Sequence, residues 1–338
     1  MAVSVTVERL TTLEDQQALL QQGRSRIESM HPHIPEIRIE PDMLQSLTTA
    51  IEQGRCAAWS CSTTGNHARS LLLAIPTALD PASSKAHFFP GRYAMHQFSC
   101  HNNNSISDIF PLYTEACRFL QEKHITVHRC SVYYNDIAAR EIWSNLGYGN
   151  HHCHTSRHVN TVTVNLPTGI TIRPAVDSDY PVVQMLFRQL VSLHNASPIL
   201  QPEPKQTAVL QDYPYLVSDP DSSLLVAEHN KEIVGYLDGY ISSSPEGYLT
   251  PLVKPPFAYV RSLYVAGRYR GRGIGSSLLQ QFNRWCSGHT SHPDRIHVDY
   301  RTANIPAAAF WRANGFEPIL IGMLRRLPKQ RNRFFSRR

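Results

Sequence analysis

The sequence predicts an α/β protein made of two copies of one plan, each a mixed, mostly antiparallel central sheet flanked by helices. Three observations predict this class. The chain has 338 residues, about twice the usual size of a domain. Short alternating, strand-like segments are interleaved with amphipathic, helix-like segments. Finally, two distant stretches share a series of small residues, aromatic residues, Asn and Gly.

The internal repeat sets the domain division. AAREIWSNLGYG, residues 138–149, matches AAAFWRANGFEP, residues 307–318, with Trp143 and Trp311 separated by 311 − 143 = 168 positions. SVTVERLTTLEDQQALL near the start likewise matches GITIRPAVDSDYPVVQML, because both read as a short strand followed by an amphipathic helix. We therefore expect a first domain at residues 1–160, a linker at 161–168, a second domain at 169–327 and a basic tail at 328–338.

The second copy alternates between strand and helix patterns along its whole length. The patterns predict strands at 171–175, 224–229, 233–242, 258–265, 296–301 and 319–327, and helices at 181–194, 273–286 and 305–315. Asn230 and Lys231 are expected to form the turn of a hairpin, and a long loop is expected to run up to Asp219.

Composition and charge narrow the class of partners. The chain is 42% hydrophobic and 18% charged, which suits a folded protein. Its net charge of +6 lies in the last 14 residues, which carry seven positive charges and no negative one, so that the rest has 6 − 7 = −1. We therefore expect no nucleic-acid partner. Seven scattered cysteines and the lack of a signal peptide or membrane-spanning run indicate a cytoplasmic protein without a membrane partner.

The cluster HHCHTSRH, residues 151–158, resembles a metal site at first sight. On a strand, however, His152 and His154 would share one face while His151 and Cys153 share the other, so the four cannot converge easily. The cluster is therefore interpreted as the last strand of the first copy, and no metal is expected.

The stretch RYRGRGIGSS, residues 268–277, has the composition of an anion-binding loop. Glycines 271, 273 and 275 let several backbone N–H groups face one point, and the following helix adds its positive end. Arginines 268, 270 and 272 can add charge-assisted bonds. The spacing fits neither a P-loop nor the dinucleotide fingerprint.

Residues 270–275 instead resemble the R/Q-x-x-G-x-G/A loop of the GNAT N-acetyltransferase superfamily. The segment ANIPAAAFWRANGFEP, about 30 residues further on, is similar to the Asn-x-x-Ala-x-x-aromatic-aromatic…Gly-Phe segment of the same family. The resemblance covers residues 169–327, with both motifs in the family's order. The first copy keeps the second motif but has HNNNSISDIF where the loop should be, and is therefore read as a degenerate GNAT-like domain.

The resemblance implies a V-shaped sheet that holds acetyl-CoA. The strand residues Leu263, Tyr264 and Val265 would lie along the pantetheine arm, which backbone groups of Leu263 and Val265 would bind. The diphosphate would bind to the loop and helix start, namely Arg270, Gly271, Arg272, Gly273, Ile274, Gly275 and Ser276. Asn304, Phe310 and Trp311 complete the expected cofactor site.

The residues for the chemistry are less clear from the sequence. Many relatives carry acidic residues where this chain has Arg261 and Ser262, and often Tyr where it has Trp311, whose indole is no acid. By strand position, Asp299 is the candidate general base, and Tyr300 or Tyr264 the candidate acid. Each also has an ordinary structural interpretation as a paired or half-buried strand residue.

Three further residues are candidates for binding the acceptor. Arg261 would bind a carboxylate or phosphate on the acceptor, or else pair with a local acid such as Asp238. His194 lies in the long loop of the second copy, which shapes the acceptor pocket in this family.

The function expected from these features is acetyl-CoA-dependent acetylation of an amine on a small molecule, by direct transfer in a ternary complex. The alternatives are another acyl group or a non-amine acceptor on the same fold, and a non-catalytic CoA-binding regulatory protein. The sequence leaves the oligomeric state open between monomer and homodimer.

Overall fold

A computed structural model describes residues 5–10, 49–51, 53–63, 69–78, 92–99, 106–160, 166–200, 213–243 and 256–328. These residues form two compact units. The first contains described residues up to His151 together with the strand from Ile321 onward, and the second runs from His152 to Leu320.

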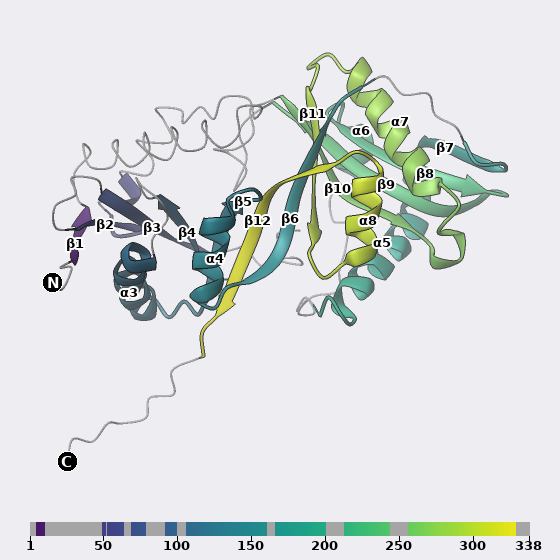
Figure 1. Cartoon of the computed structure of the whole chain (residues 1–338). Coiled ribbons are helices and arrows are strands. Elements are labelled where there is room, and N and C mark those ends of the chain that lie inside the picture. Colours follow the sequence, from purple (N-terminus) through teal and green to yellow (C-terminus); the bar gives the residue numbers. More distant parts are fainter. Residues whose placement is uncertain are drawn as a thin grey trace. The chain divides into compact units, whose positions relative to one another are not determined.

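The second unit is a six-stranded mixed sheet in the order β6-β11-β10-β9-β8-β7 (Figure 1). Only β10 and β11 run parallel, and the other neighbouring pairs are antiparallel. Its strands are β6 (Gly149–His158), β7 (Ile170–Pro174), β8 (Ser222–His229), β9 (Glu232–Ser242), β10 (Phe257–Val265) and β11 (Arg295–Arg301). Its longer helices are α5 (Tyr180–Asn195), α7 (Ile274–Gly288) and α8 (Ile305–Ala313), with a short α6 (Tyr213–Ser218).

The two faces of this sheet pack against different helices because strand side chains alternate. On one face α7 buries Leu278, Leu279 and Phe282, which are fully buried against Val260 and Val298 of β10 and β11. On the other face α5 packs its apolar side chains, such as Val183 and Leu186, against β8, β9 and β10. Burying a side chain of this size contributes about 1.5–3 kcal/mol. The predicted strands and helices of the second copy are confirmed, with α6 added in the expected long loop.

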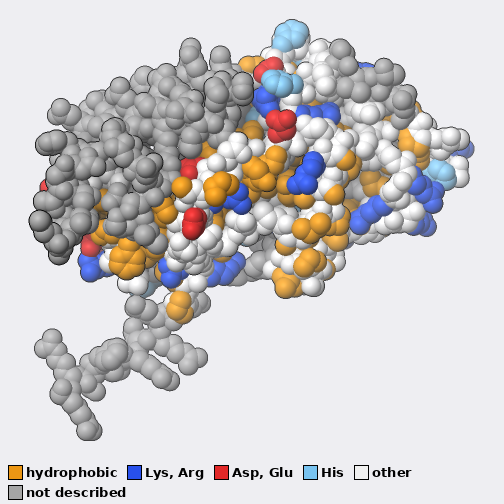
Figure 2. All heavy atoms as spheres, viewed as in Figure 1, with side chains coloured by type: hydrophobic (Ala, Val, Ile, Leu, Met, Phe, Trp, Pro, Cys, Tyr) orange, Lys and Arg blue, Asp and Glu red, His pale blue; other side chains and the backbone are white. Residues whose placement is uncertain are grey.

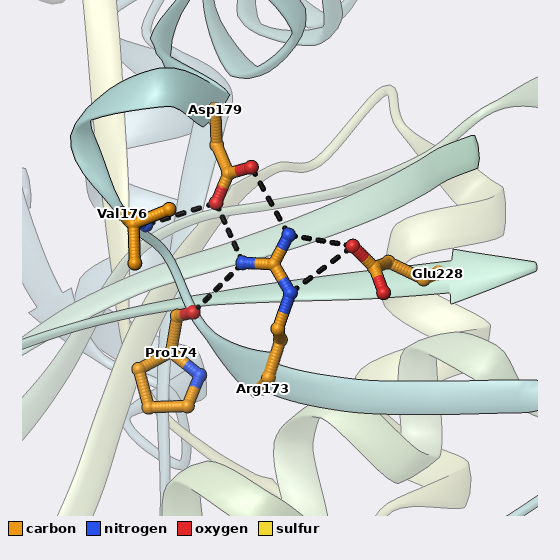
Figure 3. Close-up of polar contacts among 5 residues, drawn as sticks. All are labelled: Arg173, Pro174, Val176, Asp179 and Glu228. Carbon is orange, nitrogen blue, oxygen red and sulfur yellow. Dashed lines mark hydrogen bonds and ion pairs between the residues drawn. The ribbon is translucent and has the colours of Figure 1, made fainter. Parts of the chain in front are cut away.

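Arg173 fastens the start of α5 to the edge of the sheet (Figure 3). Its guanidinium donates to both carboxylate oxygens of Asp179, at 2.6 and 3.0 Å, and to one oxygen of Glu228 on β8. Asp179 also accepts from the Val176 amide at 2.9 Å. Hydrogen bonds from Arg173 lower the pKa of the Asp179 carboxyl. The acidic helix start predicted from the sequence therefore lies where α5 leaves strand β7.

The first unit repeats this order as β1-β2-β3-β4-β5-β12, with β4 and β5 as its parallel pair. Its strands are β1 (Val5–Leu10), β2 (Ala57–Thr63), β3 (Arg69–Ala78), β4 (Arg92–Ser99), β5 (Val127–Tyr133) and, from Ile321 on, β12 (Glu317–Arg326). Helices α3 (Ile106–Glu122) and α4 (Ile137–Asn145) correspond in order to α7 and α8.

The interior beneath α3 is polar. Tyr148 Oη donates to Tyr113 Oη at 3.1 Å, and Tyr113 Oη lies 2.9 Å from His128 Nδ1. Burial lowers the pKa of His128 to about 4, so this imidazole is neutral at pH 7.

The last strand of each sequence copy belongs to the other unit. From His152 on, β6 of the first copy lies in the second unit, where it pairs with β11 from Arg301↔His152 to Arg295↔His158. In the first unit, Leu327 just after β12 donates its amide to Thr126 O at 2.7 Å. The cluster at residues 151–158 is thus a strand, as predicted. The contiguous domain boundaries at 160 and 169 stay a prediction, because the compact units follow a different division.

Some predictions concern residues outside the described part of the chain. These are the helix after β1, the Asn-rich turn at 101–105, part of the linker, and the basic tail from residue 329. Among the described residues, no helix is both long and apolar enough to cross a membrane.

Candidate active site

The arginine–glycine loop joins β10 to α7 in the second unit. Gly271 and Gly273 have φ angles of +75° and +81°, which side-chain-bearing residues rarely adopt. Gly273 is the N-cap of α7, and Ser277 is the residue whose amide first closes back on it, donating to Gly273 O at 3.0 Å. The amides of Ile274, Gly275 and Ser276 precede that bond, so they have no carbonyl of the helix to bind. This end of α7 can therefore accept an anion.

Gly275 has a steric reason to be glycine. A Cβ at this position would lie 3.1 Å from the ring of Phe310 and 3.6 Å from Leu263 Cδ2. The first turn of α7 thus approaches β10 and α8 closely enough to exclude a side chain. Three predicted cofactor residues, Leu263, Gly275 and Phe310, are brought together here.

The three loop arginines are exposed but differ in their contacts. Arg268 pairs with Glu232, Arg270 Nε donates to Val265 O at 2.9 Å, and the Arg272 guanidinium lies 5.5 Å from the Tyr269 ring. The first turn of α7 contains no acidic residue. On the face drawn in Figure 2, Lys and Arg side chains gather at the end of the second unit that carries β7 and β8, without Asp or Glu among them. The loop is therefore electropositive.

Beyond this loop, β10 and β11 part. They pair at Ala258↔Ile296, Tyr259↔His297 and Val260↔Val298, where their described pairing ends. β10 then carries a register shift at Arg261 and continues against β9, while β11 continues against β6. We call the point just beyond Val260 and Val298 the fork. It supplies the V-shaped sheet that the sequence predicted.

Asp299 lies at the fork, directly after the last paired residue of β11. Its Oδ1 is 2.7 Å from His154 Nδ1 on β6, and its Oδ2 accepts from the Tyr259 hydroxyl at 3.0 Å. Its side chain is 17% exposed. A carboxylate held at both oxygens yet open to solvent is suited to accept a proton from a bound molecule.

The two candidate acids lie on opposite faces of the sheet. Tyr300 packs against the core beneath α7, whereas Tyr264 lies on the α5 side, with the Arg270 guanidinium 5.0 Å from its ring. Asp299 and Tyr259 are on the α5 side, because Val298 and Val260 face α7. The structure therefore places Tyr264, and not Tyr300, on the face of Asp299.

The candidate acceptor residues have partners of their own. Arg261 binds Asp238 through Nε, at 3.1 and 3.0 Å, and through Nη2 at 2.7 Å. Burial raises the pKa of the Asp238 carboxyl, and Arg261 opposes that rise. His194 lies in the last turn of α5, so its placement in a loop was wrong; burial, with Arg301 nearby, lowers its pKa to about 4.

Two residues of the aromatic motif have structural roles. Asn304 is the N-cap of α8 and accepts from the Ala307 amide at 3.2 Å. Trp311 is 6% exposed and packs between Phe310 and Phe316, with ring centroids 4.9 and 5.1 Å away. Their contact with a cofactor stays a prediction.

Comparison with known proteins decides the family. Residues 187–316 match the model of the Acetyltransferase (GNAT) family, a range that includes the loop, the fork and the aromatic motif. The chain belongs to the GNAT superfamily. A curated relative, an N-alpha-acetyltransferase of Sulfurisphaera tokodaii, is 28% identical over 121 residues, which is 34% of this chain and 71% of that protein.

Solved structures show that this GNAT protein shares its two-copy fold. A GCN5-related N-acetyltransferase from Sphaerobacter thermophilus aligns with a TM-score of 0.56 at 13% identity, over 96% of this chain and 97% of that one. A glucosamine N-acetyltransferase region of a fungal multi-domain GH3 β-N-acetylglucosaminidase aligns with a TM-score of 0.53 at 12% identity, over 96% of this chain and 38% of that one. The predicted tandem GNAT fold is confirmed, and the protein is an acetyltransferase.

Sequence reasoning missed two residues of this GNAT site. Tyr259 precedes the part of β10 that the motif covers, and His154 comes from the other sequence copy. The alternation of the cluster at 151–158 did indicate that His152 and His154 share a face. It could not indicate which strand they would face.

Proposed function

We propose that this GNAT protein transfers the acetyl group of acetyl-CoA to a primary amine of a small molecule. The observation that carries the proposal is one contiguous arrangement in the second unit: an anion-binding helix start, a fork in the sheet, and a carboxylate at that fork. Binding of the diphosphate by Arg270–Ser276, and of the pantetheine arm along Leu263 and Val265, is supported by the open amides and by the glycine at position 275.

The chain's own groups supply the proton transfers. The thioester supplies an activated acyl carbon, and the amine nitrogen attacks it within the ternary complex. Asp299 takes the proton that the amine loses when the new C–N bond forms, and Tyr264 gives a proton to the sulfur as the C–S bond breaks. Net proton balance is restored through solvent. Alignment of the two substrates at the fork can contribute about 7–11 kcal/mol toward the barrier.

The first unit is assigned no coenzyme site. The family match begins at residue 187, within the second copy, and the arginine–glycine loop has no counterpart in the sequence before α3. Its polar interior around Tyr113, His128 and Tyr148 also differs from the apolar core beneath α7. We infer that the first copy is degenerate for coenzyme binding and serves the second unit structurally.

A second class of acceptor is favoured by one observation. The curated relative from Sulfurisphaera tokodaii is named an N-alpha-acetyltransferase, so α-amino groups of peptides belong among the acceptors to be tested. Its match spans 34% of this chain, and the small-molecule amine remains our first proposal.

An acceptor panel tests the proposal directly. Free thiol released from acetyl-CoA is measured in steady state with amino sugars, polyamines, amino acids, short peptides and matched alcohols. We expect release that depends on an amine from the small-molecule group. Release only with peptides would move the assignment to α-amino acetylation, and release that is equal with amines and alcohols, or absent from the whole panel, would contradict the proposal.

A further inference from the structure

The strand that the first copy gives to the second unit carries a histidine that contacts the candidate base. His154 is 1% exposed, and its ring lies parallel to that of His297, with centroids 5.1 Å apart and an interplanar angle of 18°. Its Nδ1 is 2.7 Å from Asp299 Oδ1, and its Nε2 is 3.0 Å from His297 Nδ1. Tyr259, His154 and His297 thus form one chain of hydrogen bonds that ends on the Asp299 carboxylate.

The proton positions in this chain follow from its two ends. Burial lowers the pKa of His297 well below its usual range, so this ring is neutral at pH 7. His297 Nε2 is buried without a hydrogen-bond partner among the described residues. Because an orphaned buried N–H is rarer and more costly than an orphaned acceptor, the single proton lies on Nδ1. His297 therefore donates to His154 Nε2, and His154 donates from Nδ1 to Asp299.

The chain of hydrogen bonds exists only in the unit that has the anion-binding loop. A shift by the repeat of 168 converts Asp299 to 299 − 168 = 131, which is Ser131, and His297 to Arg129. The position 168 residues after His154 on the exchanged strand of the other unit is Gly322. Tyr259 pairs with His297 as Met95 pairs with Arg129, so its counterpart is Met95. All four polar positions differ, which separates this network from what the shared fold requires.

We propose that His154 is a positioning residue for acetyl transfer: its Nδ1–H holds the Asp299 carboxylate ionised and fixed at the fork. The first sequence copy would then contribute to the site through strand β6. This inference rests on the proposed function, in which Asp299 is the base. Tyr259 is the second donor and fixes the other oxygen, which leaves the remaining lone pairs of the carboxylate for a substrate proton.

The other titratable groups around Asp299 are partnered or neutral. They come from β6, β11, β10, β9 and α5, and are His152, His297, Arg301, Tyr259, Arg261, Tyr240, Asp238 and His194. Arg261 is held by Asp238, and burial keeps His194 neutral at pH 7. Burial also raises the pKa of Tyr259, which keeps its hydroxyl a donor. His154 and Tyr259 are therefore the groups through which the titration of Asp299 can be altered selectively.

Two amide substitutions at position 154 separate the role of Nδ1 from that of Nε2. In His154→Asn the side-chain amide occupies roughly the place of Nδ1 and can still donate to Asp299. In His154→Gln it reaches the place of Nε2, keeps the contact with His297 and leaves Asp299 without this donor. A bond to a charged acceptor of this kind corresponds to about a ten- to hundred-fold effect. We expect kcat/KM at neutral pH to fall by that factor in His154→Gln and by much less in His154→Asn.

The pH profile gives a readout that a packing defect would not change. The acid limb of kcat/KM should move to higher pH in His154→Gln, because the ionised carboxylate has lost a donor. Tyr259→Phe should move the limb in the same direction, and it provides the test should His154→Gln fail to fold. His158→Gln, on the exposed end of the same strand, is the matched control and should leave rate and profile unchanged. The Kd for acetyl-CoA should be unchanged in all four variants.

The outcomes are distinct from those of the proposed function. Absence of acetyl transfer by the unaltered protein contradicts the proposed function itself. If the unaltered protein is active, equal losses in His154→Asn and His154→Gln, or an acid limb that stays in place in both His154→Gln and Tyr259→Phe, would overturn the positioning role.

Discussion

Gly273→Glu is expected to abolish binding of acetyl-CoA while the protein stays folded. The new carboxylate would lie at the N-cap of α7, where the open amides and Arg270 and Arg272 are proposed to hold the diphosphate. Losing two charge-assisted bonds of about 1.5 kcal/mol each weakens binding by at least about 100-fold, before charge repulsion is added. Isothermal titration calorimetry with acetyl-CoA measures the effect directly.

Two variants separate charge from backbone strain in this experiment. Gly273 has a φ of +81°, so any side chain there costs roughly 1–2 kcal/mol in stability. Gly273→Asn adds a side chain that tolerates this conformation and carries no charge, and should retain much of the binding. Gly288→Glu places the same carboxylate at the other end of α7, where a Cβ meets nothing within 4 Å, and should bind acetyl-CoA normally. An unchanged Kd in a folded Gly273→Glu protein would show that the loop does not hold the diphosphate.

Asp299→Asn is expected to lower kcat by about 10²–10⁴-fold with little change in acetyl-CoA affinity. The amide keeps the shape of the carboxylate but cannot accept a proton from the amine. The acid limb of the pH profile of kcat/KM should disappear with it, because the titrating base is gone. Rapid measurement of free-thiol release across pH gives both quantities.

Asp294→Asn is the matched control for this variant. Asp294 precedes β11, and its side chain is 74% exposed, so the same substitution there should leave rate and profile unchanged. A normal rate and an unaltered profile in Asp299→Asn would remove Asp299 from the mechanism, and with it the positioning role of His154.

The secondary structure of the second copy could be predicted because each signal is local. Gly271 and Gly273 fix the turn before α7, and both adopt positive φ angles. Asn230 and Lys231 turn the β8–β9 hairpin with φ angles of +52° and +65°, as the sequence predicted. Alternation in β10 and β11 likewise predicted which side chains share a face.

The exchange of the last strands could not be predicted, because it does not depend on local pattern. Strand β6 reads as a strand wherever it pairs, and only its partner decides what His154 contacts. A duplicated chain offers each terminal strand two equivalent sheets, and the sequence repeat by itself favours the nearer one. Here His154 finds Asp299, and Arg157 donates to Asn314 O at 2.9 Å, so the choice is made by long-range contacts.

Two predicted roles were weakened by packing rather than by motif. Trp311 matches the family's aromatic position but lies in the core beside Phe316, and Arg261 is bound on one side by the buried Asp238. Motif matches identify the position in the fold, whereas the partners of each side chain depend on residues elsewhere. Asp299 illustrates the opposite case, since its candidacy rested on strand position alone and the structure gives it two donors.

The most direct measurement is a crystal structure of the protein with acetyl-CoA bound. The account predicts the diphosphate on the amides of residues 271–276, the pantetheine arm along Leu263 and Val265, and the thioester at the fork near Asp299. A cofactor bound in the first unit, or one in the second unit that leaves the start of α7 empty, would contradict it.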